Sequence, residues 1–195
     1  MEYFSAKNTH SEASIRKLSE VQYNLFGLAK QLGIFLSGLV MIGVGLLVPV
    51  GEISFFLLLF IGGWLIVSVK LPQRRQADKL IEAMNGRYPQ SSFSFQEKSL
   101  LVTVPEDCQQ VPYGKIVCLA EDAEAYYIFI HYLSAYMVPK NSLRPKDDEG
   151  FKAFLSKKTG LLFQKPCSLL GLSLKELRVR LANVRTLRAR RAAKK

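Results

Sequence analysis

The sequence has few of the residues that enzymes use to hold a metal ion or to build a nucleophile. It contains three cysteines and two histidines, and no two cysteines stand in a CxxC spacing. It also lacks a glycine-rich phosphate loop and a G-x-S-x-G motif. Cys118 and His131 fall on neighbouring predicted strands and form one formal nucleophile–base pair, but a core or partly exposed histidine is the commoner role on such a strand. We therefore expect no enzyme activity, no cofactor and no metal site.

Charge of either sign is missing from two long stretches of the chain. No charged residue occurs in 32–51 or in 53–69, and only Glu52 separates the two runs. The first apolar run of about 19 residues would form about 28 Å of helix, which is close to the hydrocarbon thickness of a bilayer, and the second of about 17 is at the short end of the spanning range. A buried helix pair in a soluble core would normally show a polar face. The pattern therefore predicts a two-helix transmembrane hairpin that turns at Pro49, Gly51 and Glu52.

The flanks of the two runs predict the direction of the hairpin. Basic residues precede the first run and follow the second, whereas the turn carries only Glu52; these basic residues are Arg16, Lys17, Lys30, Lys70, Arg74, Arg75 and Lys79. Because short loops rich in Lys and Arg stay in the cytoplasm, both termini are expected there. The absence of charge inside the runs argues against an ion or proton pathway through the hairpin.

Five segments follow along the chain, and together they predict an α+β membrane protein. Residues 1–31 are expected to form an N-terminal amphipathic helix, either at the membrane interface or docked on the soluble domain, and 32–69 the hairpin. A stalk helix is expected over 70–90. Short strand-like stretches separated by turns predict a small β-rich domain over 91–160, closed by a helix from about Asp147 to Lys157 that Gly160 ends. A basic helical tail is expected over 161–195.

The turns and strands of the β-rich segment resemble a known family. The residues that carry the resemblance are Tyr113-Gly114-Lys115-Ile116, Glu121, the aromatic strand 126–130, the segment 138–143 and the segment 151–155. In these residues and in the order of segments from about Ser11 to Gly160, the chain resembles the YcxB-like family of bacterial membrane proteins. The resemblance implies two N-terminal spans, a small β-rich domain similar to pleckstrin-homology folds, and a place in the bacterial cytoplasmic (inner) membrane. It implies no catalytic residue.

Two basic side chains of the β-rich segment are candidates for ligand contact. Lys140 follows the segment Met137-Val138-Pro139, and Arg144 lies four residues further on. One interpretation is a loop that presents both cations to phosphate head groups at the membrane surface. The other is an edge strand ended by Pro139, with a solvated lysine after it.

The tail is the strongest charge signal in the sequence. Residues 172–195 hold nine basic residues against Glu176 alone. Ser173 and Glu176 have the spacing of a capping box, and Leu174, Leu177, Leu181 and Val184 form one apolar stripe on a basic helix. The tail residues that we predict to contact a partner or lipid are Lys175, Arg178, Leu181, Arg185 and Arg188.

Four interpretations of the tail remain open. The stripe can enter the membrane interface while the cations contact anionic lipid, or it can enter a groove on an acidic partner protein. Contact with RNA is the third, although no aromatic residue interleaves for base stacking, so nucleic acid is the least favoured partner class. A solvated, frayed tail is the fourth.

From the sequence we expect a non-catalytic, membrane-anchored interaction or regulatory subunit that docks a partner at the cytoplasmic face. The alternative is a module that binds anionic lipid through Lys140, Arg144 and the basic tail.

Overall fold

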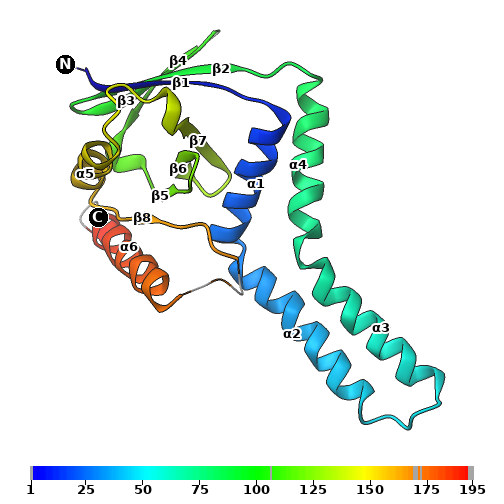
Figure 1. Cartoon of the computed structure of the whole chain (residues 1–195). Coiled ribbons are helices and arrows are strands. Elements are labelled where there is room, and N and C mark those ends of the chain that lie inside the picture. Colours follow the sequence, from blue (N-terminus) through cyan, green and yellow to red (C-terminus); the bar gives the residue numbers. More distant parts are fainter. Residues whose placement is uncertain (1, 106, 169–170, 172, 193–195) are drawn as a thin grey trace.

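The computed structural model describes residues 2–105, 107–168, 171 and 173–192. Two four-stranded sheets form the part of the chain that lies away from the apolar hairpin (Figure 1). The first sheet has the order β1-β2-β3-β4 and is antiparallel throughout. Its strands are β1 (Glu2–Thr9), β2 (Gln90–Gln96), β3 (Ser99–Val104) and β4 (Asp107–Pro112).

The second sheet has the order β7-β6-β5-β8. β5 (Cys118–Glu121), β6 (Ala125–His131) and β7 (Ser134–Pro139) are antiparallel neighbours, and the two-residue strand β8 (Phe163–Gln164) pairs with β5 in parallel. Two single turns of 3-10 helix lie in the connections. η2 (Tyr113–Lys115) lies between β4 of the first sheet and β5 of the second, and η3 (Lys140–Ser142) follows β7. β2 has the apolar alternation of a strand with one buried face. β6 has an unbroken apolar run because both of its faces are buried.

The main hydrophobic core lies between the two sheets and helix α5 (Asp148–Thr159). Phe95, Tyr126, Ile128 and Phe151 are fully buried in it, and Phe151 contacts both Phe95 and Tyr126 edge-on or tilted. The Asp147 carboxylate caps the first turn of α5 by accepting a hydrogen bond from the Gly150 amide (2.9 Å). The predicted closing helix is confirmed.

The helices between β1 and β2 form one long segment that extends away from the first sheet. They are α1 (Glu12–Phe26), α2 (Leu28–Gly45), α3 (Ile53–Val67), the turn η1 (Ser68–Lys70) and α4 (Leu71–Met84). The chain leaves the sheet after Thr9 and returns at Gln90, and these two residues pair across β1 and β2. Both ends of this helical segment are therefore fixed to adjacent strands. Within the segment, α1 lies beside α4 and α2 beside α3 (Figure 1).

Glycine allows α2 and α3 to approach closely. A Cβ atom on Gly62 would lie 2.7 Å from Ile42 Cγ1 and 2.8 Å from the Gly38 carbonyl oxygen, so only glycine fits at this crossing. By contrast, Gly33 and Gly63 have open space where a Cβ atom would stand. α2 and the continuous helical stretch Ile53–Met84 are each long and apolar enough to cross a membrane.

The N-terminal residues differ from the sequence interpretation. Residues 2–9, which we had assigned to an N-terminal helical segment, form strand β1, and the helix begins only at Glu12. The two sheets also include β4 and β8, two strands that the sequence did not indicate. Val21 and Leu25 of α1 pack on Tyr127 and Phe129 in a second apolar cluster. α1 is therefore docked on the β-rich part of the chain, one of the two arrangements that the sequence left open.

Candidate interaction surface

Helix α6 (Leu174–Ala192) docks on the rest of the chain through polar contacts and through Leu187, which packs against the main hydrophobic core. Asn183 is only 2% exposed, and its side-chain amide makes two hydrogen bonds to the Leu162 backbone: the Leu162 amide donates to Oδ1 (2.8 Å) and Nδ2 donates to the carbonyl (2.8 Å). The Lys165 amide donates to Glu176 (3.1 Å). Arg180 donates to the Asn24 carbonyl at the end of α1 (3.3 Å). These contacts fix the rotation of α6 about its own axis.

The apolar stripe of α6 faces away from this docked side. Leu174 and Leu181 are 77% and 58% exposed, and Leu177 and Val184 are exposed as well. Successive helical residues are about 100° apart, so Leu181 lies about 200° from Asn183 around the axis. The docked side of the helix thus buries Asn183 and packs Leu187 against the main hydrophobic core, whereas the stripe of Leu174, Leu177, Leu181 and Val184 stays exposed.

The predicted tail residues all lie on the uncovered part of α6. Leu181 belongs to the stripe, and the cationic residues around it are exposed; they are Lys175, Arg178, Arg185 and Arg188. None of these four cations has a salt bridge within the described part of the chain. The helix therefore combines an apolar row with unpaired positive charge on one accessible face.

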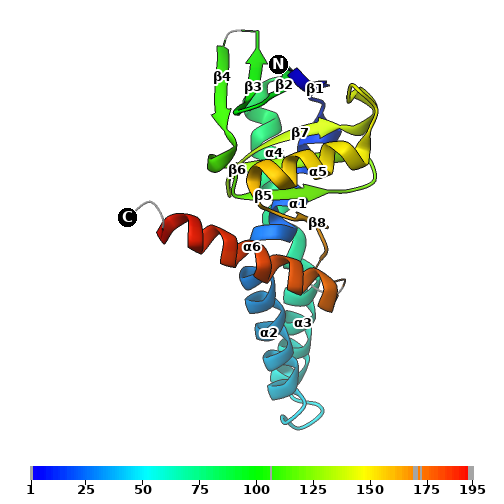
Figure 2. The ribbon, with the colours of Figure 1, turned by 90° about the vertical axis from the view of Figure 1, so that its left-hand side faces the viewer.

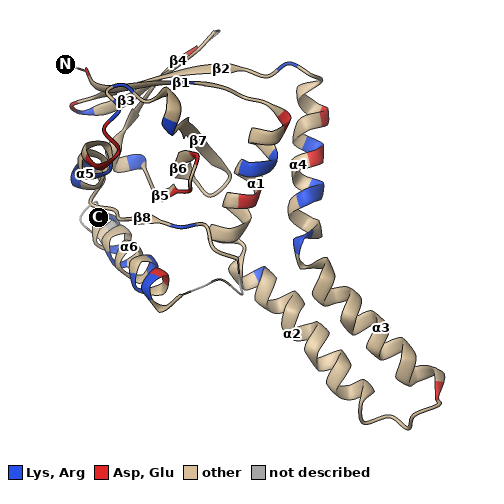
Figure 3. Cartoon of the chain, viewed as in Figure 1, with Lys and Arg blue, Asp and Glu red and all other residues tan. Residues whose placement is uncertain are grey.

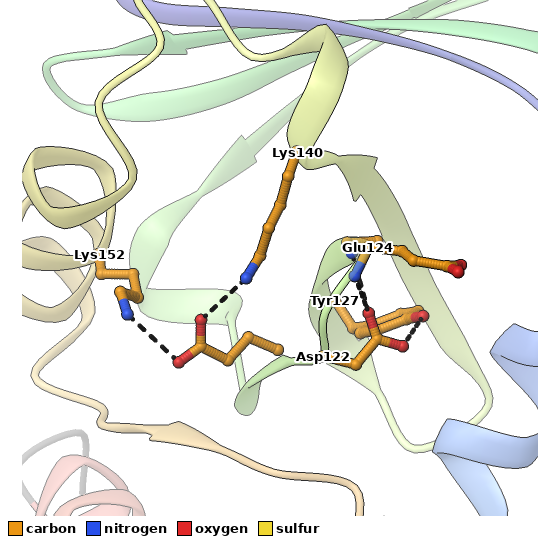
Figure 4. Close-up of polar contacts among 7 residues, drawn as sticks. Asp122, Glu124, Tyr127, Lys140 and Lys152 are labelled. Carbon is orange, nitrogen blue, oxygen red and sulfur yellow. Dashed lines mark hydrogen bonds and ion pairs between the residues drawn. The ribbon is translucent and has the colours of Figure 1, made fainter.

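Lys140 and Arg144 lie elsewhere and serve local structure. Lys140 is ion-paired with Glu121 (3.4 Å) and stands over the Tyr126 ring at 4.8 Å, while Lys152 contacts the other oxygen of Glu121 (3.3 Å; Figure 4). Arg144 donates to the carbonyls of Asn141 and Leu143, and its backbone bridges Ser5 of β1. The structure therefore does not bring these two cations to the surface that α6 presents, and Lys140 is ion-paired rather than simply solvated.

A second polar cluster ties α1 to the β5–β6 turn. Asp122 accepts hydrogen bonds from the Glu124 and Ala125 amides (2.8 and 2.9 Å) and from the Tyr127 hydroxyl (2.8 Å; Figure 4), and Lys17 lies 3.4 Å away. Burial raises the pKa of Asp122, but the three hydrogen bonds and the Lys17 charge outweigh it and hold the pKa below its usual value. Burial, reinforced by the bond to Asp122, raises the pKa of Tyr127.

An open cavity of about 480 Å³ adjoins this cluster, lined by Lys17, Asn24, Glu121, Asp122 and Lys140 among others. Its principal charges are already matched, because Lys17 pairs with Asp122 and Lys140 with Glu121. The cluster therefore acts as a structural link between α1 and the second sheet.

The thiol and imidazole side chains are not arranged for nucleophilic chemistry in the described part of the chain. Cys118 pairs with Phe129 across the sheet, and burial raises its pKa to about 12, so the thiol stays protonated at neutral pH. His131 is exposed and accepts only a long contact from the Leu133 amide (3.4 Å). Within the described residues no group of three His, Cys, Asp or Glu side chains could hold a metal ion.

The sequence predicted the exposed surface of α6 only in part. The apolar stripe and its basic neighbours were predicted, but Asn183, which determines which face is free, was missed. An asparagine in the middle of a helix is the signal that could have found it, because this residue is a weak helix former and its side chain competes for backbone hydrogen bonds.

One protein-family model matches part of the chain. Residues 95–155 match the family model described as YcxB-like protein, which confirms the resemblance over this segment, from the end of β2 into α5. The match is narrower than the resemblance from about Ser11 to Gly160 and includes neither the apolar hairpin nor α6. No curated protein and no solved structure matches the chain.

Proposed function

We propose that the chain is a non-catalytic interaction or regulatory subunit, anchored in the bacterial inner membrane, which docks a protein partner at the cytoplasmic face through α6. The observation that carries the proposal is the orientation of this helix. Its polar side is held by Asn183, and its leucine stripe is left without a cover among the described residues. An apolar helix face that the fold itself does not bury is typical of a surface that another molecule covers.

The exposure of the hairpin supports the membrane anchor. Only 17% of the apolar window in α2 and 6% of that in the stretch Ile53–Met84 is buried, whereas a core helix of a soluble protein would be mostly covered. In Figure 3 the two arms of the hairpin carry no Lys, Arg, Asp or Glu between their junction with the rest of the chain and the turn. An acidic residue lies at the turn. The basic residues cluster where α2 and α4 meet the rest of the chain, so the positive-inside rule supports a two-pass protein with cytoplasmic termini.

The chemistry of α6 defines the kind of partner that it fits. A partner with an apolar groove would receive Leu177 and Leu181, and acidic side chains on the rim would face the arginines. Apolar anchors supply most of the affinity in such contacts, whereas rim charges set orientation and association rate. The partner that we propose is therefore a membrane or cytoplasmic protein whose docking groove is apolar in the centre and acidic at the edge.

A second candidate function has its own observation. α6 lies at the height where the hairpin joins the rest of the chain in both views (Figures 1 and 2), and Ser168 just before it adjoins Phe35 and Ile66 of the hairpin. The stripe is thus near the level of the proposed bilayer surface. In this alternative the chain is a module that binds anionic lipid through α6. Lys140 and Arg144 contribute little to it, because Lys140 is held by Glu121 and Arg144 lies beside β1.

Purification from native membranes in a gentle detergent tests the docking function. The variant carries Leu177→Gln and Leu181→Gln in the full-length chain, and the control carries Tyr132→Gln and Leu133→Gln, which are similarly exposed but stand in the β6–β7 turn. Ending the chain at Gly160 is unsuitable because it removes β8 and the fully buried Leu161. Loss of two buried leucines costs about 3 kcal/mol or more of binding free energy, on the order of a hundredfold in affinity.

The expected result is a stoichiometric protein that co-purifies with the wild type and the control but not with the stripe variant. A protein free of partners in all three preparations contradicts the docking function. In that case an environment-sensitive dye at position 181, in nanodiscs with and without anionic lipid, tests the second candidate. A blue shift that requires anionic lipid and decreases with salt supports lipid binding by α6.

A further inference from the structure

A groove separate from α6 lies where the hairpin joins α4. Its volume is about 670 Å³, within the range of small-molecule sites. Three cations line it, Lys30 from the first turn of α2 and Arg75 and Lys79 from α4, together with apolar side chains that include Ile34, Leu65 and Leu71. Ser168 lies on another face of the same junction, beside Gln31 and Phe35.

The end of this groove that continues into the hairpin is lined by apolar side chains and carries no cation. Ile34 follows Lys30 by one turn of α2 in the direction of the hairpin tip, and Leu65 precedes Arg75 along α3 and α4 by about 15 Å of helix. The cations therefore line the end near the β-rich part of the chain, where Leu80 also lies, whereas Ile34 and Leu65 line the end that continues into the hairpin. Glycerophospholipids have the same order of chemistry, with a charged head group above an acyl chain.

The cations of the groove are not neutralised by the protein. On the α1 side of α4, Arg16 pairs with Asp78 (2.6 Å), and Lys70 of η1 lies 3.9 Å from Glu20. By contrast, no salt bridge involves Lys30, Arg75 or Lys79 in the described part of the chain, and no acidic residue lines the groove. Three exposed and unpaired cations around one groove make it complementary to an anion.

We propose that this groove binds one anionic glycerophospholipid of the cytoplasmic leaflet, with its phosphate at Lys30, Arg75 and Lys79 and an acyl chain along Ile34 and Leu65. The proposal depends on the membrane placement of the hairpin, but not on docking through α6. The bound lipid bridges the start of α2 to α4 and so fixes the angle between the hairpin and the β-rich part of the chain. Neutral lipids lack the net charge that the three cations select.

Native mass spectrometry of the full-length protein in detergent tests this site. The probes are dioleoyl phosphatidylglycerol, dioleoyl phosphatidylcholine and water-soluble glycerol phosphate. The test variant carries Lys30→Gln, Arg75→Gln and Lys79→Gln. The control removes the same charge at Lys98, Lys146 and Lys157, which are exposed, unpaired and away from the groove. A second variant, Lys30→Arg with Lys79→Arg, keeps the charge.

The wild type, the control and the charge-conserving variant are expected to bind one phosphatidylglycerol in preference to phosphatidylcholine. Each cation near an anionic lipid is worth about fivefold in affinity, so the test variant should bind on the order of a hundredfold more weakly. Equal binding by the test variant overturns the proposal, as does binding of glycerol phosphate as tight as that of the lipid.

Extraction of membranes with alkaline carbonate distinguishes failure of the lipid site from failure of the membrane placement of the hairpin. A protein released by carbonate overturns both the placement and the lipid site. A protein that stays in the membrane while its variant retains phosphatidylglycerol overturns the lipid site alone.

Discussion

The orientation of α6 depends on Asn183, and replacing this residue is a direct test of it. Asn183→Ala removes two hydrogen bonds of 2.8 Å and leaves the amide and carbonyl of Leu162 without their partners. Each such bond contributes about 1 kcal/mol, so the docked state should lose at least about 2 kcal/mol. The equilibrium constant for release of α6 then increases about 30-fold at the lower limit.

Hydrogen exchange followed by mass spectrometry on the full-length protein measures this release. Amides of α6 should exchange faster in Asn183→Ala, because a released helix frays, while those of β6 should be unchanged. Val184→Ala is the matched control: it is the next residue on the same helix, and its side chain is exposed. If α6 exchanges equally in the two variants, Asn183 does not hold the helix and the assignment of its free face is wrong.

Three further predictions concern the hairpin, the α1 link and the thiols. Gly62→Val should force α2 and α3 apart and lower the thermal stability by about 1–3 kcal/mol, as overpacking does, whereas Gly63→Val has open space and should have little effect. Asp122 has a lowered pKa, so its ionised form stabilises the fold above the unfolded-state pKa, and this contribution is lost as the pH falls through the lower folded-state pKa. Asp122→Asn should therefore reduce stability at neutral pH by about 2 kcal/mol and show a smaller deficit in acid. A maleimide should modify the exposed Cys108 in the folded protein, whereas the buried Cys118 should react only after unfolding.

Each of these three has a specific contrary result. Equal melting temperatures for the two glycine variants would contradict the close crossing of α2 and α3. A deficit of Asp122→Asn that stays constant from neutral pH to about pH 3 would show that its charge is not what stabilises the turn. Labelling of Cys118 at the same rate as Cys108 in the native protein would contradict its burial.

Local signals in the sequence were sufficient for several elements. The hairpin follows from the two uncharged runs, and α5 from the cap at Asp147 and the stop at Gly160, whose φ of 59° favours glycine. β2 shows the alternation of a strand with one buried face, and its burial pattern has the same period. Each of these features depends on residues that are close together in the chain.

Strands β1 and β4 lack such local signals. In β1 the buried positions are Phe4, Ala6 and Asn8, so only one large apolar side chain faces the core, and pairing with β2 more than 80 residues away forms the strand. In β4 only Val111 is buried, which leaves no apolar alternation to detect. Both strands depend on their neighbours, and strand propensity is known to depend strongly on such context.

The apolar periodicity of the sequence did not predict which side of α6 is docked. Periodicity identifies the stripe of Leu174, Leu177, Leu181 and Val184 but does not say which surface covers it. The fold holds the helix by hydrogen bonds from Asn183 to Leu162, 21 positions earlier in the chain, and by the packing of Leu187 against the main core. The pleckstrin-homology likeness of the β-rich part stays a prediction.

Site-specific photocrosslinking in native membranes tests the central claim most directly. A photoreactive amino acid at position 181 of the full-length chain samples the free face of α6, and the same amino acid at position 133 samples an equally accessible turn. Docking through α6 predicts one discrete protein adduct from position 181 and none of the same mass from position 133. Adducts to lipid alone from position 181, or the same adducts from both positions, would contradict the proposed docking role.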